Sequence, residues 1–356
     1  MQYDEVRRGT IPLYTADQIR QQRPFYSTDT PAHDSYGRRI DYLRISLTDR
    51  CNMRCVYCMP EIGMQFMPRS ELLTTGELLL VVRAAARAGF RKIRLTGGEP
   101  TLRPDIVEIV REIKRTPGIT HVAMTTNALR LEKLAEPLRE VGLDRVNISI
   151  DTLDPEKFRR MTRGGSFEKV WAGIEAADRA GLHPIKLNSV VVRGMNDEEV
   201  PQLAALTLRY PWEMRFIEVM PLAGVADLAQ SSVVTSAELI ARLEAVYGPL
   251  EDLGLAPADS ARRYRIPGAP GKLGFISSVS EPFCATCNRM RLTSDGRLHL
   301  CLLRDQEVDL RAAIRSGASL DEIEQIIRHA VALKPWGHGL PEGVLPTLRG
   351  MSELGG

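Results

Sequence analysis

The six cysteines of this sequence fall into two groups of three, and their spacing favours metal chemistry. Cys51, Cys55 and Cys58 lie in the run CNMRCVYC, separated by three and then two residues. Three thiolates on one loop can ligate three irons of a [4Fe–4S] cluster and leave the fourth iron open. Structural zinc is the main alternative, but it takes four ligands, and this run offers no fourth Cys or His. A disulfide with a spare thiol is less favoured.

The second group comprises Cys284, Cys287 and Cys301, in which the pair CATC is followed by a third cysteine after thirteen residues. The same chemistry predicts a second [4Fe–4S] cluster with one iron free for a non-protein ligand. A zinc site with His299 as its fourth ligand is the alternative, and it would brace a small, loop-rich region. The spacing alone leaves both open.

Basic residues are further candidates, because they recur on one side of segments with strand-like alternation. Lys92, Arg94 and Thr96 alternate with Ile93 and Leu95. The same parity turns other polar residues inward, namely Arg44, Thr125, Lys186 and Asn188. Strands of a covered parallel sheet are usually apolar on both faces, so this pattern predicts a wet, ligand-holding interior.

Several cations in one cavity are costly unless an anion or a paired acid is present. A multiply charged anionic substrate would supply the anion. The alternative is a set of structural ion pairs with Glu99, Asp151 or Glu218. Arg289 and Arg291, which share one side of the run NRMR, could likewise clamp phosphates, or they could form an exposed basic edge.

These residues require a scaffold of alternating strands and helices. Strand-like segments are expected at residues 43–47, 92–97, 121–127, 145–151, 185–192 and 214–220. Helical segments are expected at residues 75–88, 105–114, 131–141, 167–180 and 197–209, the first with a capping box of Thr74 and Glu77. Consecutive β/α units imply a parallel sheet, and six of them predict an α/β fold with an incomplete (β/α)6 TIM-type barrel. The first cysteine group then follows the first strand, at the end of the barrel where active sites lie.

Three regions follow from the change of pattern along the chain. Residues 1–39 are polar and contain prolines, and we expect a partly ordered lead-in. Residues 40–247 form the predicted partial barrel. Residues 248–356 begin with many Gly and Pro and then hold short strands, the second cysteine group and helices near Leu310 and Ile323. This pattern predicts a smaller C-terminal cluster-binding unit that ends in a Gly-Gly tail.

The composition and net charge of the chain indicate which kinds of binding partner are disfavoured. The chain has 356 residues, of which 44% are hydrophobic and 26% charged, and its net charge is +2. This balance is typical of a globular protein and disfavours binding to nucleic acid or to an anionic membrane. No apolar run approaches the roughly 18 to 20 residues of a membrane span, and the N-terminal segment lacks the apolar core of a secretion signal. We therefore expect a cytoplasmic protein with reduced cysteines.

The run CxxxCxxC, with Tyr57 before its last cysteine, resembles the signature of the radical S-adenosylmethionine superfamily. The run GGEP at residues 97–100, at the end of the second predicted strand, resembles the glycine-rich turn of that superfamily. The resemblance implies that the open iron binds the amino and carboxylate groups of S-adenosylmethionine. Reductive cleavage of this molecule would release a 5′-deoxyadenosyl radical.

The whole pattern resembles one family of this superfamily, GTP 3′,8-cyclase, also described as molybdenum cofactor biosynthesis protein A. Both cysteine groups, the run CNRMR, the inward cations and the Gly-Gly terminus carry the resemblance, which extends from about Gly37 to Gly356. It implies a lyase that converts GTP into 3′,8-cyclo-7,8-dihydroguanosine 5′-triphosphate in molybdenum cofactor (molybdopterin) biosynthesis. The radical would take the 3′ hydrogen of the ribose, and the resulting carbon radical would attack C8 of guanine.

The resemblance also implies a role for each candidate residue. Two [4Fe–4S] clusters would be held by Cys51, Cys55 and Cys58 and by Cys284, Cys287 and Cys301. S-adenosylmethionine would contact Tyr57, Gly97, Gly98, Glu99, Ser149 and Met220. GTP would contact Arg44, Lys92, Arg94, Thr125, Lys186, Arg215, Arg289, Met290 and Arg291, with its guanine on the open iron of the second cluster. The residues expected to support the radical step are Arg44, Arg289, Arg291, Gly355 and Gly356.

The resemblance further implies a homodimer and hand-over of the product to cyclic pyranopterin monophosphate synthase, while the electron donor is not indicated. Two other functions stay open. A radical S-adenosylmethionine enzyme that modifies a peptide would need a peptide-binding module and more C-terminal cysteines, and neither is evident. A non-catalytic zinc or iron–sulfur protein would leave the polar interior and its cations unexplained.

Overall fold

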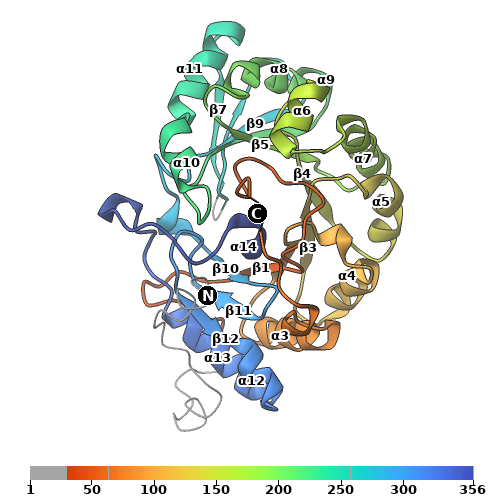
Figure 1. The fold of residues 1–356 in the computed structure, drawn as a ribbon, viewed down its shortest axis with the longest axis vertical. Coiled ribbons are helices and arrows are strands. Elements are labelled where there is room, and N and C mark those ends of the chain that lie inside the picture. The colour runs from red at the N-terminus through yellow and green to blue at the C-terminus, as the bar shows by residue number, and fades with distance from the viewer. Residues whose placement is uncertain (1–29, 63, 257–258, 356) are drawn as a thin grey trace. The chain divides into compact units, whose positions relative to one another are not determined.

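The computed structural model describes residues 30–62, 64–256 and 259–355 of the chain. Strands and helices alternate along these residues as the sequence predicts (Figure 1). The strands of the barrel pattern are β1 Tyr42–Ser46, β2 Lys92–Thr96, β3 His121–Thr126, β4 Arg145–Ser149, β5 Lys186–Val191 and β6 Glu213–Glu218. The helices between them include α3 Thr75–Arg87, α4 Ile106–Arg115, α5 Leu131–Glu140, α7 Phe167–Arg179 and α8 Val200–Ala204.

The chain divides into two compact units that are each discontinuous in sequence. The first unit comprises Met1–Cys51, Gln65–Ala123 and Asn288–Gly356, and the second comprises Asn52–Met64 and Met124–Cys287. These units are defined by packing rather than by position along the chain. The sequence-based boundaries after residues 39 and 247 therefore stay a prediction.

Each unit contains a series of mainly parallel strands. In the first unit the order is β12–β11–β10–β1–β2, in which β10 Arg289–Leu292 is parallel to β1, while β11 Arg297–His299 and β12 Glu307–Asp309 are antiparallel. In the second unit the order is β4–β5–β6–β9–β8–β7, in which β9 Lys272–Ile276 is parallel to β6, while β8 Arg262–Arg265 and β7 Glu251–Leu255 are antiparallel. Each series ends in antiparallel strands instead of closing on itself. The predicted α/β class with an incomplete barrel is confirmed.

The main difference from the sequence-based expectation is that β9 pairs in parallel with β6 and β10 pairs in parallel with β1. Both strands lie beyond residue 248, in the region expected to form a separate small unit, yet each extends a series of barrel strands. β10 is only four residues long. Alternation over so short a segment is too weak to indicate a barrel strand, and its partner β1 is far away in the sequence.

The start and end of α3 show why the predicted helices form. The side chain of Thr74 accepts a hydrogen bond from the N–H of Glu77, and the Glu77 carboxylate accepts one from the N–H of Thr74. This capping box satisfies N–H groups that the first turn leaves without a partner. After the helix, Gly89 has a φ of +105°, and a Cβ there would lie 2.8 Å from the backbone of Pro31.

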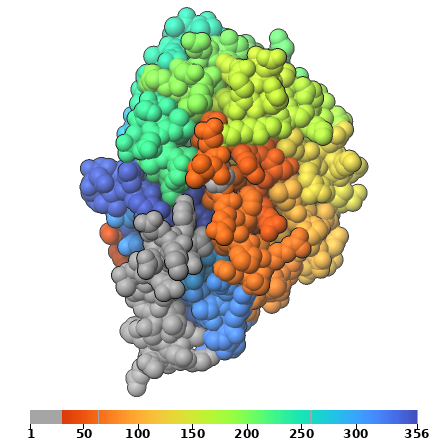
Figure 2. Space-filling view, in the orientation of Figure 1, coloured from red at the N-terminus to blue at the C-terminus, as the bar shows by residue number. Residues whose placement is uncertain are grey.

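Other helices differ from the expectation in detail. The sequence analysis misses α6 Pro155–Thr162, α10 Ala226–Ser232 and α11 Ser236–Tyr247, and it finds α12 Leu310–Arg315 and α13 Leu320–Ala332. The segment 197–209, expected as one helix, forms η3 Asp197–Glu199, α8 and α9 Leu206–Arg209. In the second unit α5 and α7 pack side by side (Figure 2). No helix within the described ranges is long and apolar enough to cross a membrane.

The alternation predicted for the strands of the first unit is confirmed. Leu43 and Ile45 on β1 and Ile93 and Leu95 on β2 are at most 1% exposed and belong to the apolar core. Neighbouring residues of the other parity are polar on both strands. Since successive side chains point to opposite faces of a sheet, one face is apolar and the other carries the chemistry.

Candidate functional site

The loop after β1 carries the first cysteine group. Cys51, Cys55 and Cys58 are of intermediate exposure. The N–H of Cys58 donates to the carbonyl of Cys55 at 2.9 Å, which closes a tight turn around the pair. The N–H of Val56 donates to the carbonyl of Met161 in α6 at 2.9 Å. The middle of this loop is therefore held by backbone contacts, while its cysteines are only partly buried.

Tyr57, the aromatic residue of the cysteine loop, is held by an acid. Its Oη donates to Oδ2 of Asp151 at 2.7 Å, and the N–H of Val190 donates to Oδ1 at 2.9 Å. Burial raises the pKa of Asp151 to about 6, although both hydrogen bonds act to lower it. Burial and the nearby Asp151 carboxylate raise the pKa of Tyr57 well above its usual value. The phenol of Tyr57 is thus committed to Asp151, which leaves its ring and backbone for a cofactor.

The glycine-rich turn after β2 lies against the segment that leads to Cys51. The N–H of Gly98 donates to the carbonyl of Thr48 at 2.7 Å, and that of Glu99 donates to the carbonyl of Arg50 at 2.8 Å. A Cβ on Gly98 would lie 2.2 Å from the Arg50 carbonyl oxygen. Glycine is therefore required by close backbone packing, independently of any cofactor.

Glu99 of the same turn has a local role. Its Oε1 accepts hydrogen bonds from the N–H of Thr101 at 3.1 Å and from the Thr101 hydroxyl at 2.6 Å. These contacts cap η2 Pro100–Leu102. The predicted contact between Glu99 and S-adenosylmethionine is not tested by them and stays a prediction.

The first unit gathers cations on one face of its sheet. Arg44 lies in register with Arg94 on β2 and with Arg291 on β10. Tyr42, two residues earlier on β1, lies in register with Lys92 and Arg289. Residues in register share a face of a sheet. We call this set the arginine face, and it consists of Tyr42, Arg44, Lys92, Arg94, Arg289 and Arg291.

Tyr42 is the member of the arginine face that the sequence analysis missed. Its hydroxyl accepts a short hydrogen bond from Nε of Arg94, and the guanidinium groups of Arg94 and Arg289 each lie 5.9 Å from the centre of its ring. Burial acts to raise the pKa of Tyr42, but the positive charges of Arg94 and Arg44 lower it by more. The pKa therefore falls from 10.0 to about 7. The same parity that indicated Arg44 would have indicated Tyr42.

Two of the residues predicted to bind GTP, Met290 and Lys92, are less well placed for this role than the arginines. Met290 is 1% exposed and in register with Leu43, on the apolar side of the sheet. Its predicted contact with GTP would have to come from its backbone. Lys92 is on the arginine face, but its Nζ lies 3.5 Å from Oδ2 of Asp41, so its charge is shared with an acid.

The second unit places its predicted cations beside acids. Nζ of Lys186 lies 3.0 Å from Oε2 of Glu213, and Nε of Arg215 donates to Oε1 of Glu213 at 2.5 Å. Arg215 also lies 3.6 Å from Asp259. Burial and the nearby Arg215 lower the pKa of Lys186 to about 8. These cations form ion pairs, but with acids that the sequence analysis did not name.

The acids named as alternative partners have other contacts. Asp151 contacts Tyr57 and Val190, as described above. Glu218 accepts hydrogen bonds from the N–H groups of Ser236 at 3.0 Å and Val279 at 3.0 Å. Glu213 has the same parity as Arg215 and could have been found from the sequence. Asp259 precedes β8 in a loop, where no local pattern marks it.

The remaining predicted residues of the second unit lie toward the carboxyl ends of barrel strands. Thr125 is near the end of β3, Ser149 ends β4 in register with Asn188, and Met220 follows β6. All three predicted residues are half-buried. Their positions agree with the end of a barrel at which ligands bind, while their contacts with GTP or S-adenosylmethionine stay predictions.

The second cysteine group lies on short, irregular segments. Cys284 and Cys287 flank a single turn, η4 Cys284–Thr286, in which the N–H of Cys287 donates to the carbonyl of Cys284 at 3.1 Å. Cys301 follows β11, and all three cysteines are half-buried. His299, the alternative zinc ligand, is 1% exposed, and its Nδ1 lies 3.3 Å from Oε1 of Glu307. Among residues 30–62, 64–256 and 259–355, no three His, Cys, Asp or Glu side chains converge as a single ion would require.

The C-terminal segment reaches the arginine face. It contains α14 Met351–Leu354, which lies beside β10 and β1 in Figure 1. Nη1 of Arg291 donates to the carbonyl of Gly355 at 2.7 Å. Gly355 has a φ of +79°, and a Cβ there would lie 1.9 Å from Oγ1 of Thr96. The structure thus brings two of the predicted catalytic residues together, whereas Gly356 lies outside the described residues.

Comparison with known proteins defines the class. The profile of the Radical SAM superfamily matches residues 45–207, and that of Molybdenum Cofactor Synthesis C matches residues 212–340. A crystal structure of SuiB from Streptococcus suis has a similar fold, with a TM-score of 0.50 and 14% identity over 75% of this chain and 62% of that chain. The chain is thus a member of the radical S-adenosylmethionine superfamily.

Curated relatives narrow the family. GTP 3′,8-cyclase from Pelotomaculum thermopropionicum is 47% identical over 327 residues, which cover 91% of this chain and 99% of that protein. Human molybdenum cofactor biosynthesis protein 1 is 44% identical over 305 residues, which cover 86% of this chain and 48% of that protein. The chain belongs to the GTP 3′,8-cyclase family, as its motifs predicted.

Membership of this superfamily implies a [4Fe–4S] cluster and S-adenosylmethionine, and the donor set of the chain fits. All six cysteines are of intermediate exposure, and they form two groups of three. A four-iron cluster with three cysteine ligands keeps one iron open, which a tetrahedral zinc site does not. Cys51, Cys55 and Cys58 would hold the first cluster, and Cys284, Cys287 and Cys301 would hold the second.

The close packing of the glycine turn leads to a first prediction. Gly98→Ala should lower the free energy of unfolding by about 1–3 kcal/mol and lower the iron content, because the added Cβ displaces the segment before Cys51. Gly76→Ala in α3 is the matched control, because a Cβ there meets nothing within 4 Å. Denaturant unfolding and iron analysis measure both effects. Equal iron content in the two variants would contradict this role of the turn.

Tyr42 leads to a second prediction. Its pKa of about 7 in the folded chain lies below the ordinary 10.0, so ionisation favours the folded state. Its contribution to stability should therefore be complete above pH 10, decline below it, and be lost as the pH falls through 7. Carbon NMR of ring-labelled tyrosine should show one phenol that titrates near pH 7.

The control for this titration is Tyr264→Phe, because burial raises the pKa of Tyr264. The signal that titrates near pH 7 should disappear in Tyr42→Phe and persist in Tyr264→Phe. A spectrum in which every tyrosine stays protonated to pH 9 would show that the arginines do not act on Tyr42 as the geometry requires.

Proposed function

We propose that the protein is a GTP 3′,8-cyclase, a radical S-adenosylmethionine lyase that forms 3′,8-cyclo-7,8-dihydroguanosine 5′-triphosphate in molybdenum cofactor biosynthesis. The observation that carries the proposal is the arginine face, with the carbonyl of Gly355 on Arg291. It lies in a chain that has both cysteine groups and belongs to this family.

The charges of the arginine face support a triphosphate ligand. Arg94 is 4% and Arg291 8% exposed, and burial and the nearby Arg291 lower the pKa of Arg44 well below its usual value. An anion on this face would relieve the repulsion among the guanidinium groups. Arginine suits this task, because its planar group can donate two parallel hydrogen bonds to phosphate oxygens.

The proposed reaction needs exact placement more than acid–base groups. Cys51, Cys55 and Cys58 would hold a cluster that, when bound and reduced, would supply the electron for cleavage of S-adenosylmethionine to methionine and a 5′-deoxyadenosyl radical. The arginines hold the triphosphate, so that the ribose 3′ hydrogen stays within reach and C3′ can bond to C8 of guanine. The carbonyl of Gly355 accepts a hydrogen bond from Arg291, so the C-terminal segment lies on the face that would hold the triphosphate.

The contacts of the cysteine loop support a role in holding S-adenosylmethionine. Tyr57 is fixed by Asp151, so its ring cannot rotate freely toward a reactive radical. Gly97 and Gly98 add no side chains to the turn that the family resemblance assigns to the methionine moiety. The homodimer, the hand-over of product to cyclic pyranopterin monophosphate synthase and a cytoplasmic location remain predictions.

The experiment that tests this function uses protein purified without oxygen. It should contain about eight irons per chain and, with dithionite, S-adenosylmethionine and GTP, should form 5′-deoxyadenosine and the cyclised product. About four irons plus one zinc would assign a structural role to Cys284, Cys287 and Cys301. Radical formation that does not depend on GTP, with a peptide as the modified substrate, would favour the alternative enzyme class.

A third prediction concerns the second cluster. Cys301→Ala should retain the first cluster, with about four irons, and uncoupled cleavage of S-adenosylmethionine, but should form no cyclised product. Uncoupled cleavage is the internal control, because it requires only Cys51, Cys55 and Cys58. Cyclisation at the wild-type rate in this variant would remove the second cluster from the proposal.

A further inference from the structure

Arg349, which the sequence analysis did not single out, lies in a buried ion-pair network just before the C-terminal helix. It is 9% exposed. Its Nη2 donates to Oδ2 of Asp295 at 3.0 Å and to Oε2 of Glu307 at 3.0 Å, and its Nε donates to Oε1 of Glu307 in a short hydrogen bond. The guanidinium group thus makes a two-pronged contact with Glu307 and a further contact with Asp295.

Glu307 belongs to the same row of the sheet as the arginines. Arg291 on β10 is in register with His299 on β11, and His299 is in register with Glu307 on β12. The C-terminal segment is therefore attached to this row twice. Arg349 binds Glu307 at its start, and the carbonyl of Gly355 accepts a hydrogen bond from Arg291 at its end.

The segment between these two attachments depends on contacts with the rest of the unit for its position. α14 spans only Met351–Leu354, and a helix of one turn has little stability of its own. The N–H of Gly350 donates to Oε2 of Glu353 at 3.0 Å, and Nη1 of Arg349 lies 3.9 Å from Oε1 of Glu353. Leu354 is 1% exposed. The helix is thus tied to Arg349 and packed against the unit.

The acids of this ion-pair network stay ionised. Burial acts to raise the pKa of Glu307, but His299 and Arg349 lower it to about 2. The pKa of Asp295 is also low, because Arg349 outweighs its burial. Both carboxylates are thus ionised across the physiological range. Removal of the guanidinium would leave two buried acids without their partner, which strongly favours rearrangement of the segment.

We propose that Arg349 is a positioning residue, whose pairing with Glu307 and Asp295 anchors the C-terminal segment so that Gly355 lies on Arg291 of the arginine face. This inference rests on the proposed function only for the consequence that the anchored segment supports cyclisation. The anchoring itself follows from contacts within the first unit and can be tested without activity.

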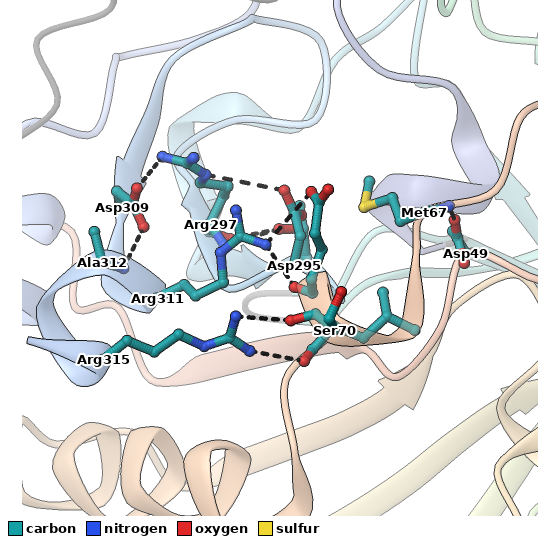
Figure 3. A network of polar contacts seen from close by, with 12 residues as sticks. Asp49, Met67, Ser70, Asp295, Arg297, Asp309, Arg311, Ala312 and Arg315 are labelled. Carbon is teal, nitrogen blue, oxygen red and sulfur yellow. Dashed lines mark hydrogen bonds and ion pairs between the residues drawn. The ribbon is translucent and has the colours of Figure 1, made fainter.

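The test compares Arg349→Met and Arg349→Lys with the control Arg297→Met. Arg297 pairs with the same Asp295 and also with Asp309 (Figure 3). Among the described residues, its ion pairs do not include the C-terminal segment. The direct readout is the rate at which carboxypeptidase releases the C-terminal residues from the cluster-loaded protein. We expect Arg349→Met to raise this rate by about 10-fold or more, Arg349→Lys to raise it less, and Arg297→Met to leave it near wild type.

The kinetic readout separates positioning from general damage. Arg349→Met should lower kcat by about 10-fold or more with the KM for GTP within about 3-fold, and Arg349→Lys should recover part of kcat. Iron content should match that of Arg297→Met. If Arg349→Met does not fold, Glu307→Gln tests the same anchor, because it keeps the shape of the side chain and removes its charge; it should also release the segment.

Two outcomes would overturn the inference: a C-terminal segment as protected in Arg349→Met and Glu307→Gln as in wild type, or equal changes in Arg349→Met and Arg297→Met. Failure of the proposed function is distinguishable from both. In that case wild-type protein forms no cyclised product, while the difference in carboxypeptidase release between Arg349→Met and Arg297→Met persists.

Discussion

The accumulation of like charges on one face of a sheet is the constraint on which the rest of the structure depends. Strand register, rather than any loop, places Arg44, Arg94 and Arg291 side by side. Such a face is stable while acceptors lie against it. The hydroxyl of Tyr42 and the carbonyl of Gly355 are two of these acceptors, and the triphosphate of the proposed substrate would be another. Groups of the protein and the proposed ligand would thus together compensate the positive charge of the arginine face.

The two units differ in how they balance their inward cations. In the second unit Lys186 and Arg215 share Glu213, and Arg215 also lies near Asp259, so acids of the chain itself compensate these cations. In the first unit, burial and the nearby Arg291 lower the pKa of Arg44, and the positive charges of Arg94 and Arg44 lower the pKa of Tyr42 because they favour its phenolate form. The case for an anionic ligand is therefore carried by the arginine face, and the cations of the second unit contribute less to it.

The sequence predicted the arginines well, because the two-residue period of a strand is a local property that needs no knowledge of the fold. It could not predict that β10 lies beside β1, because pairing between distant segments depends on the whole chain. Arg349 was missed for the same reason, since its acids lie on other segments. The cysteine and glycine motifs indicated the family, yet the packing of Gly98 on Arg50 emerges only from the structure.

The affinity of Arg94→Met for GTP and for guanosine tests the central claim most directly. Methionine replaces the aliphatic part of this buried side chain but carries no charge. The account predicts that GTP binds about 10- to 100-fold more weakly, while guanosine affinity changes by less than about 3-fold, because only the triphosphate contacts the arginine face. An equal loss for both ligands, or unchanged GTP affinity, would contradict the claim that this face binds the triphosphate.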